Sequence, residues 1–149
     1  MGIFDKFKKI QSKMDDVNSK IENNARGNSE TAIEFAKSFR KELDYSKNSI
    51  KDLEDILDYY SNDISKSKPT ENQIWSMSMI FGSYLGETML KNGLAQKGYK
   101  WGRDNTSDIP LLIANNGGYI TPNDKVYKRL VNGKQDNVIS FYNYVMENL

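Results

Sequence analysis

One nearly uncharged run, Asn72 to Leu90, constrains the fold of this 149-residue chain more than any other feature. Glu87 is its only charged residue, and apolar side chains would cover most of its circumference as a helix. Thr70 and Gln73 form a capping-box pattern before it, and Gly93 stands where a helix would stop. A helix that is apolar nearly all round is typical of the centre of a domain, so we expect a buried central helix.

The same run contains small residues at intervals of four, namely Ser78, Gly82 and Gly86. Each glycine lowers helix propensity by roughly 1 kcal/mol, so we expect the stripe to admit the close approach of another backbone. The run is long enough to tempt a transmembrane interpretation, but a carboxylate at membrane depth costs several kcal/mol. We therefore expect a soluble protein, and a cytoplasmic one, because the N-terminus lacks the continuous apolar region of a signal peptide.

The N-terminal segment has a heptad pattern of apolar residues from Ile3 to Ile21, with charged residues between them. The polar, turn-rich sequence at Asn23–Asn28 should end this helix. We therefore divide the chain into an appended amphipathic helix and turn, residues 1–28, and a single α+β domain, residues 29–149. The pattern predicts an N-terminal interaction seam made of Phe7, Ile10, Met14, Val17 and Ile21.

Three kinds of contact are open to this seam. It can pack on its own chain or on a second copy. It can also lie on an anionic membrane surface, because Lys6, Lys8, Lys9 and Lys13 make the helix basic and amphipathic. The strict heptad spacing and the acidic continuation of the segment favour contact with protein.

A second heptad segment runs from Ala32 to Ile64 and stays in phase, although the polar Ser46 interrupts its seam. One unbroken helix of that length would reach roughly 50 Å, whereas a compact domain of this size has a radius of gyration near ~15 Å. We expect a break at Asp44–Lys47, with Ser46 capping a new helix. The N-terminal half is thus predicted to be a heptad-patterned helical hairpin or bundle.

The C-terminal half combines short strands with helices. Alternating and apolar runs predict strands at 99–103, 109–114 and 118–120, and the turn sequence Asn115–Gly118 joins the last two as a hairpin. Caps and apolar spacing predict two further helices after residue 121. The predicted fold class is therefore α+β and mostly helical, with N-terminal helices, a central buried helix, a small three-stranded antiparallel sheet and two C-terminal helices.

The chain contains no cysteine and no histidine. Thiolate metal sites and the Ser-His and Cys-His forms of nucleophilic catalysis are therefore excluded, along with most zinc chemistry. The acidic loop at Asp104–Asp108 lacks the spacing of a calcium loop, and a net charge of +1 is too small to make nucleic acid the default partner. We expect no metal, no cofactor and no nucleic-acid partner.

Glu87 is the leading candidate for a site, because a buried carboxylate needs a partner. Arg129 is the first candidate for that partner, since a guanidinium can bind a carboxylate through two parallel hydrogen bonds, and Lys125 is the second. Whether such a pair is structural or part of a binding site stays open. The other candidates for contacts with a ligand or partner are Tyr84, Trp101 and Lys128.

Several motifs occur in order along the chain: D-Y-S-K-N-S-I-K-D-L from Asp44, G-S-Y-L-G-E from Gly82, then Trp101, and K-V-Y-K-R-L-V-N-G from Lys125. They resemble a scattered family of small bacterial proteins of uncharacterised function, over roughly residues 30–145. The resemblance implies a bacterial cytoplasmic α+β domain and no particular reaction. Its recurring polar and aromatic residues would be Tyr84, Glu87, Trp101, Lys125 and Arg129.

These observations predict a non-enzymatic bacterial binding protein of immunity or antitoxin type, whose partner is another bacterial or phage protein. Self-association through the N-terminal helix is a further option. One alternative is a peripheral membrane protein held by that helix. The other, with less support, is a hydrolase that uses carboxylates, for which the sequence nominates only Glu87.

Overall fold

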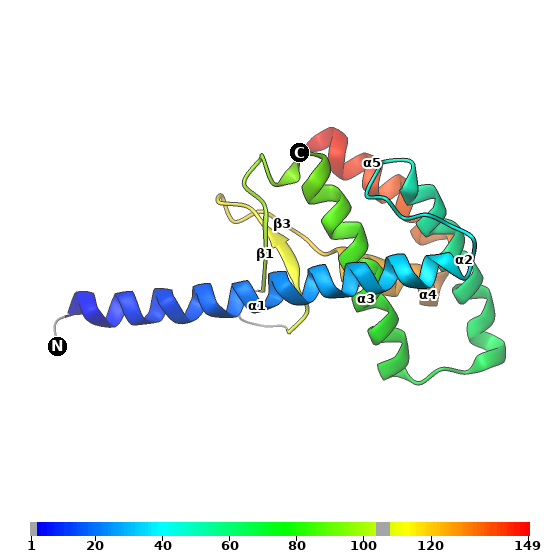
Figure 1. The fold of residues 1–149 in the computed structure, drawn as a ribbon, viewed down its shortest axis with the longest axis horizontal. Coiled ribbons are helices and arrows are strands. Elements are labelled where there is room, and N and C mark those ends of the chain that lie inside the picture. Colours follow the sequence, from blue (N-terminus) through cyan, green and yellow to red (C-terminus); the bar gives the residue numbers. More distant parts are fainter. Residues whose placement is uncertain (1–2, 104–107) are drawn as a thin grey trace.

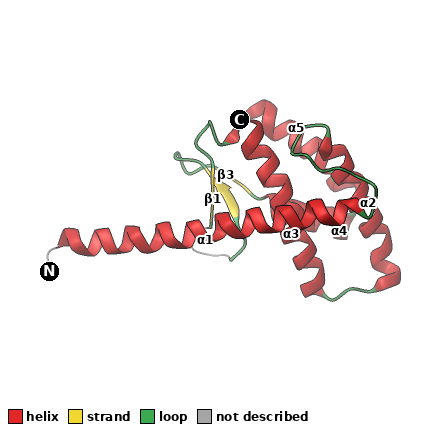
Figure 2. Cartoon of the chain, in the orientation of Figure 1, coloured by secondary structure: helices red, strands yellow, loops and turns green. Residues whose placement is uncertain are grey.

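The computed structural model describes residues 3–103 and 108–149, except for the side chains of residues 3–7 and 10–15. Its elements are α1 (Ile3–Lys37), α2 (Ser49–Ser67), α3 (Glu71–Met89), the π-helical turn η1 (Leu90–Leu94), β1 (Lys100–Gly102), β2 (Leu111–Ile113), β3 (Tyr119–Ile120), α4 (Pro122–Asn132), the 3-10 turn η2 (Lys134–Asp136) and α5 (Val138–Asn148). Figure 1 and Figure 2 show that helices dominate, with one small sheet. The predicted mostly helical α+β class is confirmed.

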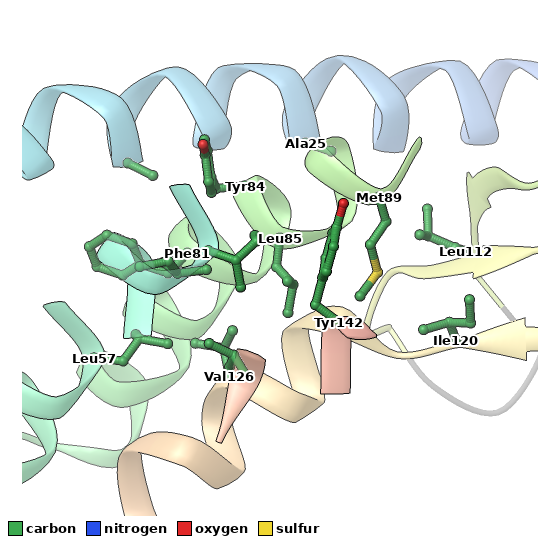
Figure 3. Close-up of a cluster of buried hydrophobic side chains, with 14 of the residues drawn as sticks. Ala25, Leu57, Phe81, Tyr84, Leu85, Met89, Leu112, Ile120, Val126 and Tyr142 are labelled. Carbon is green, nitrogen blue, oxygen red and sulfur yellow. The ribbon is translucent and has the colours of Figure 1, made fainter. Parts of the chain in front are cut away.

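Helix α3 is the central helix that the sequence predicted. Its capping box forms, since the Thr70 amide donates to Gln73 Oε1 at 2.8 Å and the Gln73 amide donates to Thr70 Oγ1 at 3.2 Å. Every residue from Phe81 to Met89 is buried, with α1 along one side and α4 along another. Figure 3 shows Tyr84 and Leu85 of α3 within a cluster of side chains from the other helices and from the sheet.

The stripe of small residues on α3 receives two close neighbours, as predicted. A Cβ atom added at Gly82 would lie 2.5 Å from the Cα atom of Asn123, near the start of α4. One added at Gly86 would lie 2.4 Å from the indole ring of Trp101 in β1. The neighbour at Gly82 is therefore a helix and the neighbour at Gly86 is the sheet. Both approaches are possible because these two positions carry no side chain.

The three strands form an antiparallel meander in the order β1-β2-β3, as predicted, with Trp101 opposite Leu112. The hairpin turn closes through the Ala114 amide, which donates to the Gly118 carbonyl at 2.8 Å. Gly117 takes a φ of +87° in this turn, a conformation that glycine adopts without a steric penalty. The sheet is held against two helices, because β1 contacts α1 and Trp101 packs on α3.

The turn predicted at residues 23–28 is wrong, because α1 continues through this segment as one helix of 35 residues. Its buried face is made of small residues, and Ala25, Ala32 and Ala36 lie on the side that packs along α3 and β1. This packing outweighs the low helix propensity of Gly27 and of the asparagines around it.

The N-terminal part of α1 projects beyond the rest of the molecule, and Figure 1 shows no other described helix or strand beside its outer end. Within the predicted seam, Val17 and Ile21 are half-buried, and Ile21 packs against the core. The side chains of Phe7, Ile10 and Met14 lie outside the described residues, so their cover by another helix stays a prediction.

The predicted break in the second heptad segment exists but begins earlier, since α1 ends at Lys37. Arg40 takes a left-handed φ of 59°, and the Lys41 amide donates back to the Ala36 carbonyl at 3.0 Å, which terminates the helix. The residue before α2 is Asn48 rather than the predicted Ser46, although Ser46 Oγ accepts the Ser49 amide at 3.2 Å in the turn that leads into the helix. The N-terminal helices then join a bundle in which α1 packs along α3 and β1, whereas α2 packs on α4 and α5.

Alanine substitutions test the close approach at α3. Gly82→Ala would drive a methyl group into the Asn123 backbone, so we expect the free energy of unfolding to fall by about 1–3 kcal/mol. Gly27→Ala is the matched control within α1, because nothing lies within 4 Å of the added Cβ atom. There we expect a gain of up to about 1 kcal/mol, measured by urea unfolding. A loss of stability in Gly27→Ala would contradict the continuous helix.

Candidate functional site

Arg129 lies at a fully buried junction of α2, α4 and α5. Its Nε atom donates to both carboxylate oxygens of Glu54 at 3.0 Å. Its Nη2 atom donates to Glu54 Oε2 at 2.8 Å and to Asp58 Oδ1 at 2.7 Å. Glu54 Oε1 also accepts the amide of Val138, the first residue of α5, at 3.2 Å. This Arg129 cluster therefore ties one side chain of α4 to two carboxylates of α2 and to the start of α5.

The charges in the Arg129 cluster stabilise one another. Burial opposes the positive charge of Arg129, but the hydrogen bonds to Glu54 and Asp58 outweigh it, so the pKa of Arg129 is raised. The two carboxylates are four residues apart and so share one face of α2. The remaining guanidinium nitrogen, Nη1, is buried without a hydrogen-bond partner among the described residues. The cluster is a permanent ionic link between three helices.

Glu87 is buried near the C-terminal end of α3. Burial raises the pKa of Glu87, and the ammonium of Lys91, the indole of Trp101 and the guanidinium of Arg26 oppose this effect without cancelling it. The nearby carboxylate of Glu22, which is paired with Arg26 on α1, raises the pKa further. The Nε1 atom of Trp101 is itself buried and makes no hydrogen bond of normal geometry with the described residues. Glu87 therefore lies among several polar groups but lacks a strong ion pair.

The cations predicted to hold Glu87 are engaged elsewhere. Arg129 binds the two carboxylates of α2, and Lys125 pairs with Asp136 at 3.2 Å. Lys128 forms an exposed ion pair within α4 at 3.1 Å. The prediction of Arg129 or Lys125 as the partner of Glu87 is wrong, because the spacing along α4 shows which residues share a face but not which neighbour that face meets.

Tyr84 joins α3 to the loop that precedes α2. Its hydroxyl accepts the Tyr45 amide at 2.8 Å and lies 2.6 Å from Ser49 Oγ. Ser49 gives its own proton to the Ser46 carbonyl at 2.7 Å, so Tyr84 is the donor to Ser49. The rings of Tyr45 and Tyr84 stack with centroids 5.1 Å apart. Burial raises the pKa of Tyr84, so this hydroxyl keeps its proton even above the pH at which an exposed tyrosine ionises.

An aromatic surface that the sequence analysis missed lies where the end of α1 meets α2 and α3. Phe39 packs edge-on against Tyr59 and Tyr60, with ring centroids 5.2 and 5.5 Å apart. Tyr59 is 57% exposed and Phe35 is 43% exposed, so the surface has a buried base and an open rim. We define the aromatic surface as Phe35, Phe39, Tyr59, Tyr60 and Phe81.

The sequence does contain one signal for the aromatic surface. Tyr59 and Tyr60 are adjacent on a helix, and adjacent helical residues do not face the same way. Because Tyr60 belongs to the apolar seam, Tyr59 had to point away from it toward solvent or a partner. Phe39 gave no such signal, because the heptad spacing placed it on a helix that has already ended at Lys37.

Among the side chains that the structure describes, no group of three or more acidic, histidine or cysteine residues could hold a metal ion. The acidic loop at residues 104–108 lies mostly outside the described residues. None of the helices in the described part of the chain is long and apolar enough to cross a membrane. The chain matches no protein-family model, and comparisons with curated proteins and with solved structures give no match. The family resemblance therefore stays an expectation.

Removal of the Arg129 guanidinium should leave the carboxylates of Glu54 and Asp58 without the cation that they bind. We expect Arg129→Met to lower the free energy of unfolding by about 3–5 kcal/mol, because the buried Glu54 would lose the cation that it binds. Lys128→Met is the matched control on the preceding, exposed residue, and it should change stability by less than about 0.5 kcal/mol. Chemical unfolding followed by circular dichroism measures both. Equal effects in the two variants would show that the cluster contributes no more than a surface pair.

Glu87→Gln tests the raised pKa of Glu87. The folded-state pKa lies above the usual value of 4.5, so between these two values the folded state binds more protons than the unfolded state. The stability contributed by this group is therefore full in acid and is lost as pH rises through the folded pKa. Relative to Glu87→Gln, the wild-type chain should lose stability over that window and be no more stable at neutral pH.

Unfolding curves at a series of pH values measure this difference, with Glu147→Gln as the control for loss of an exposed carboxylate. A wild-type chain that is more stable than Glu87→Gln at neutral pH, and equal to it in acid, would mean that the surrounding cations outweigh burial.

Proposed function

We propose that this chain is a non-enzymatic binding protein of immunity or antitoxin type, which acts in the bacterial cytoplasm by contacting another bacterial or phage protein. The aromatic surface is the observation that carries the proposal. Partly exposed tyrosine and phenylalanine side chains around a buried base are typical of the residues that dominate the energy of protein–protein binding.

The surroundings of the aromatic surface support this role. Phe81 at its base is fully buried in α3, so the rings above it rest on a packed core. Tyr59, Asp52 and Asp55 are spaced three and four residues apart along one face of α2. Lys41 lies 3.5 Å from Asp52 and 3.3 Å from Asp55, which gives this edge a network of opposite charges. An aromatic centre with a polar rim is the usual anatomy of a protein interface.

The buried charges favour binding over chemistry. A carboxylate-based hydrolase needs two carboxyl groups that flank a cleft open to substrate. Glu54 and Asp58 instead share the guanidinium of Arg129 in a junction between helices. Glu22, the acidic residue that influences Glu87, is exposed and paired with Arg26. These groups are engaged by their own chain, which supports the non-enzymatic proposal.

Tyr59→Ala and Phe35→Ala test the proposed interface. The wild-type chain and the variants are immobilised at equal density and incubated with an extract of the source bacterium. We expect a partner that the wild-type chain retains and that binds each variant at least about tenfold more weakly. Tyr144→Ala is the matched control, because Tyr144 is 70% exposed on α5. Equal binding by all four proteins would contradict the proposed interface.

The immunity or antitoxin type is tested with the captured partner. Expression of the partner alone should arrest growth, and co-expression of the wild-type chain should restore it, whereas co-expression of Tyr59→Ala should not. If expression of the partner has no effect on growth, the immunity or antitoxin type is contradicted, and the chain is a binding protein of another type.

A further inference from the structure

An open groove lies at the end of the molecule where α2 is joined to α3 by the short connection Lys68–Thr70. Helix α2 packs on α4 and α5, whereas α3 packs on α1 and α4, and Figure 1 shows the connection between α2 and α3 at the lower edge of the molecule. The α2–α3 groove beside this connection has a volume of about 470 Å³. Half of its lining is apolar and half is polar: the apolar residues are Tyr60, Ile64, Pro69 and Met77, and the polar ones are Asp63, Ser67, Gln73 and Ser76.

Asp63 is the only charged residue among the described residues that line the α2–α3 groove. It is half-buried, and its carboxylate makes no hydrogen bond or ion pair with the described part of the chain. An unpaired, half-buried carboxylate is stabilised by a cation that approaches from outside. The groove therefore fits an occupant with apolar side chains and at least one positive charge.

The chain contains a segment with this chemistry. We define the α1 arm as residues 3–16, the projecting end of α1 in Figure 1. Its sequence places Phe7, Ile10 and Met14 at heptad positions. The arm carries four lysines, all within residues 6–13, and three aspartates, Asp5, Asp15 and Asp16. An amphipathic helix that lays an apolar ridge into a hydrophobic groove is a recurrent mode of recognition.

We propose that the α1 arm of one copy of this chain docks in the α2–α3 groove of a second copy. The contact cannot form within one chain, because the arm and the groove lie at opposite ends of the molecule and α1 is a single helix (Figure 1). The apolar positions of the arm meet the apolar lining, and a lysine of the arm pairs with Asp63. If two copies each dock their arm in the groove of the other, they form a closed dimer. If each copy docks its arm in the next copy only, the assembly is an open oligomer. The inference does not depend on the proposed function.

Pairing between two arms is the competing way to cover the seam. Lys6, Lys13 and Lys20 recur at intervals of seven beside the apolar positions. An antiparallel pair of arms would therefore bring lysines against lysines, and a parallel pair would place them opposite the uncharged Gln11 and Asn18. Neither arrangement gives these lysines an opposite charge, whereas the groove supplies Asp63.

Disulfide trapping in the full chain tests the contact between the α1 arm and the α2–α3 groove directly, because the natural sequence contains no cysteine. Two singly substituted proteins are mixed, one with Met77→Cys in the groove and one with Phe7→Cys, Ile10→Cys or Met14→Cys in the arm. We expect a mixed disulfide for at least one arm position, and no such product when Met146→Cys on α5 replaces Met77→Cys. Disulfides between two arms only, or no disulfide at all, would overturn the proposal.

Sedimentation velocity over a concentration series provides the test without cysteines. The wild-type chain should associate, and Asp63→Lys should weaken association at least about tenfold, because it places like charges together. Glu147→Lys makes the same charge change on α5 and should associate as the wild-type chain does. A monomer at all concentrations, or equal association of both variants, would overturn the proposal. Melting curves of each variant confirm that the fold is retained.

Discussion

A helix that is apolar on every side is stable only when every side is covered, and this requirement on α3 organises the rest of the chain. Helix α1 covers one side and α4 another, while Trp101 of the sheet lies on Gly86. The two glycines set the distances, because α4 and β1 could not come as near to a helix that carried side chains there. The core shown in Figure 3 is therefore built around α3 and draws side chains from every layer.

Helices α2 and α5 lie outside this first layer and are positioned partly by charge. In the Arg129 cluster, the planar guanidinium of α4 fixes the direction of its hydrogen bonds to Glu54 of α2, and Glu54 in turn accepts the Val138 amide of α5. A buried ion group of this kind adds little net stability compared with apolar packing, but a misplaced helix would leave its charges unpaired at a large energetic cost. We interpret the cluster as the feature that fixes the register of the outer helices.

Features that depend on residues close in sequence were predicted correctly, whereas features that depend on contacts between distant segments were not. The capping box at Thr70, the hairpin turn before Gly118 and the small-residue stripe depend on neighbours in sequence, and all three predictions are confirmed. The prediction of a turn at residues 23–28 failed because it relied on the polar composition of this segment and overlooked the small residues on the buried face of α1. The prediction of a cationic partner for Glu87 failed for a related reason. The spacing of residues along α4 does not show how α4 is oriented against α2.

The residues that carry the family resemblance are mostly the ones that hold the fold. Tyr45 and Ser49 of the first motif form hydrogen bonds with Tyr84 of the second, and Gly86 of the second receives the ring of Trp101. A motif of buried mutual contacts stabilises the fold of its own chain and says little about a partner. The exposed rim at Phe35 and Tyr59 and the projecting end of α1 both lie outside these motifs, so the two proposed contacts depend on residues that do not hold the core together.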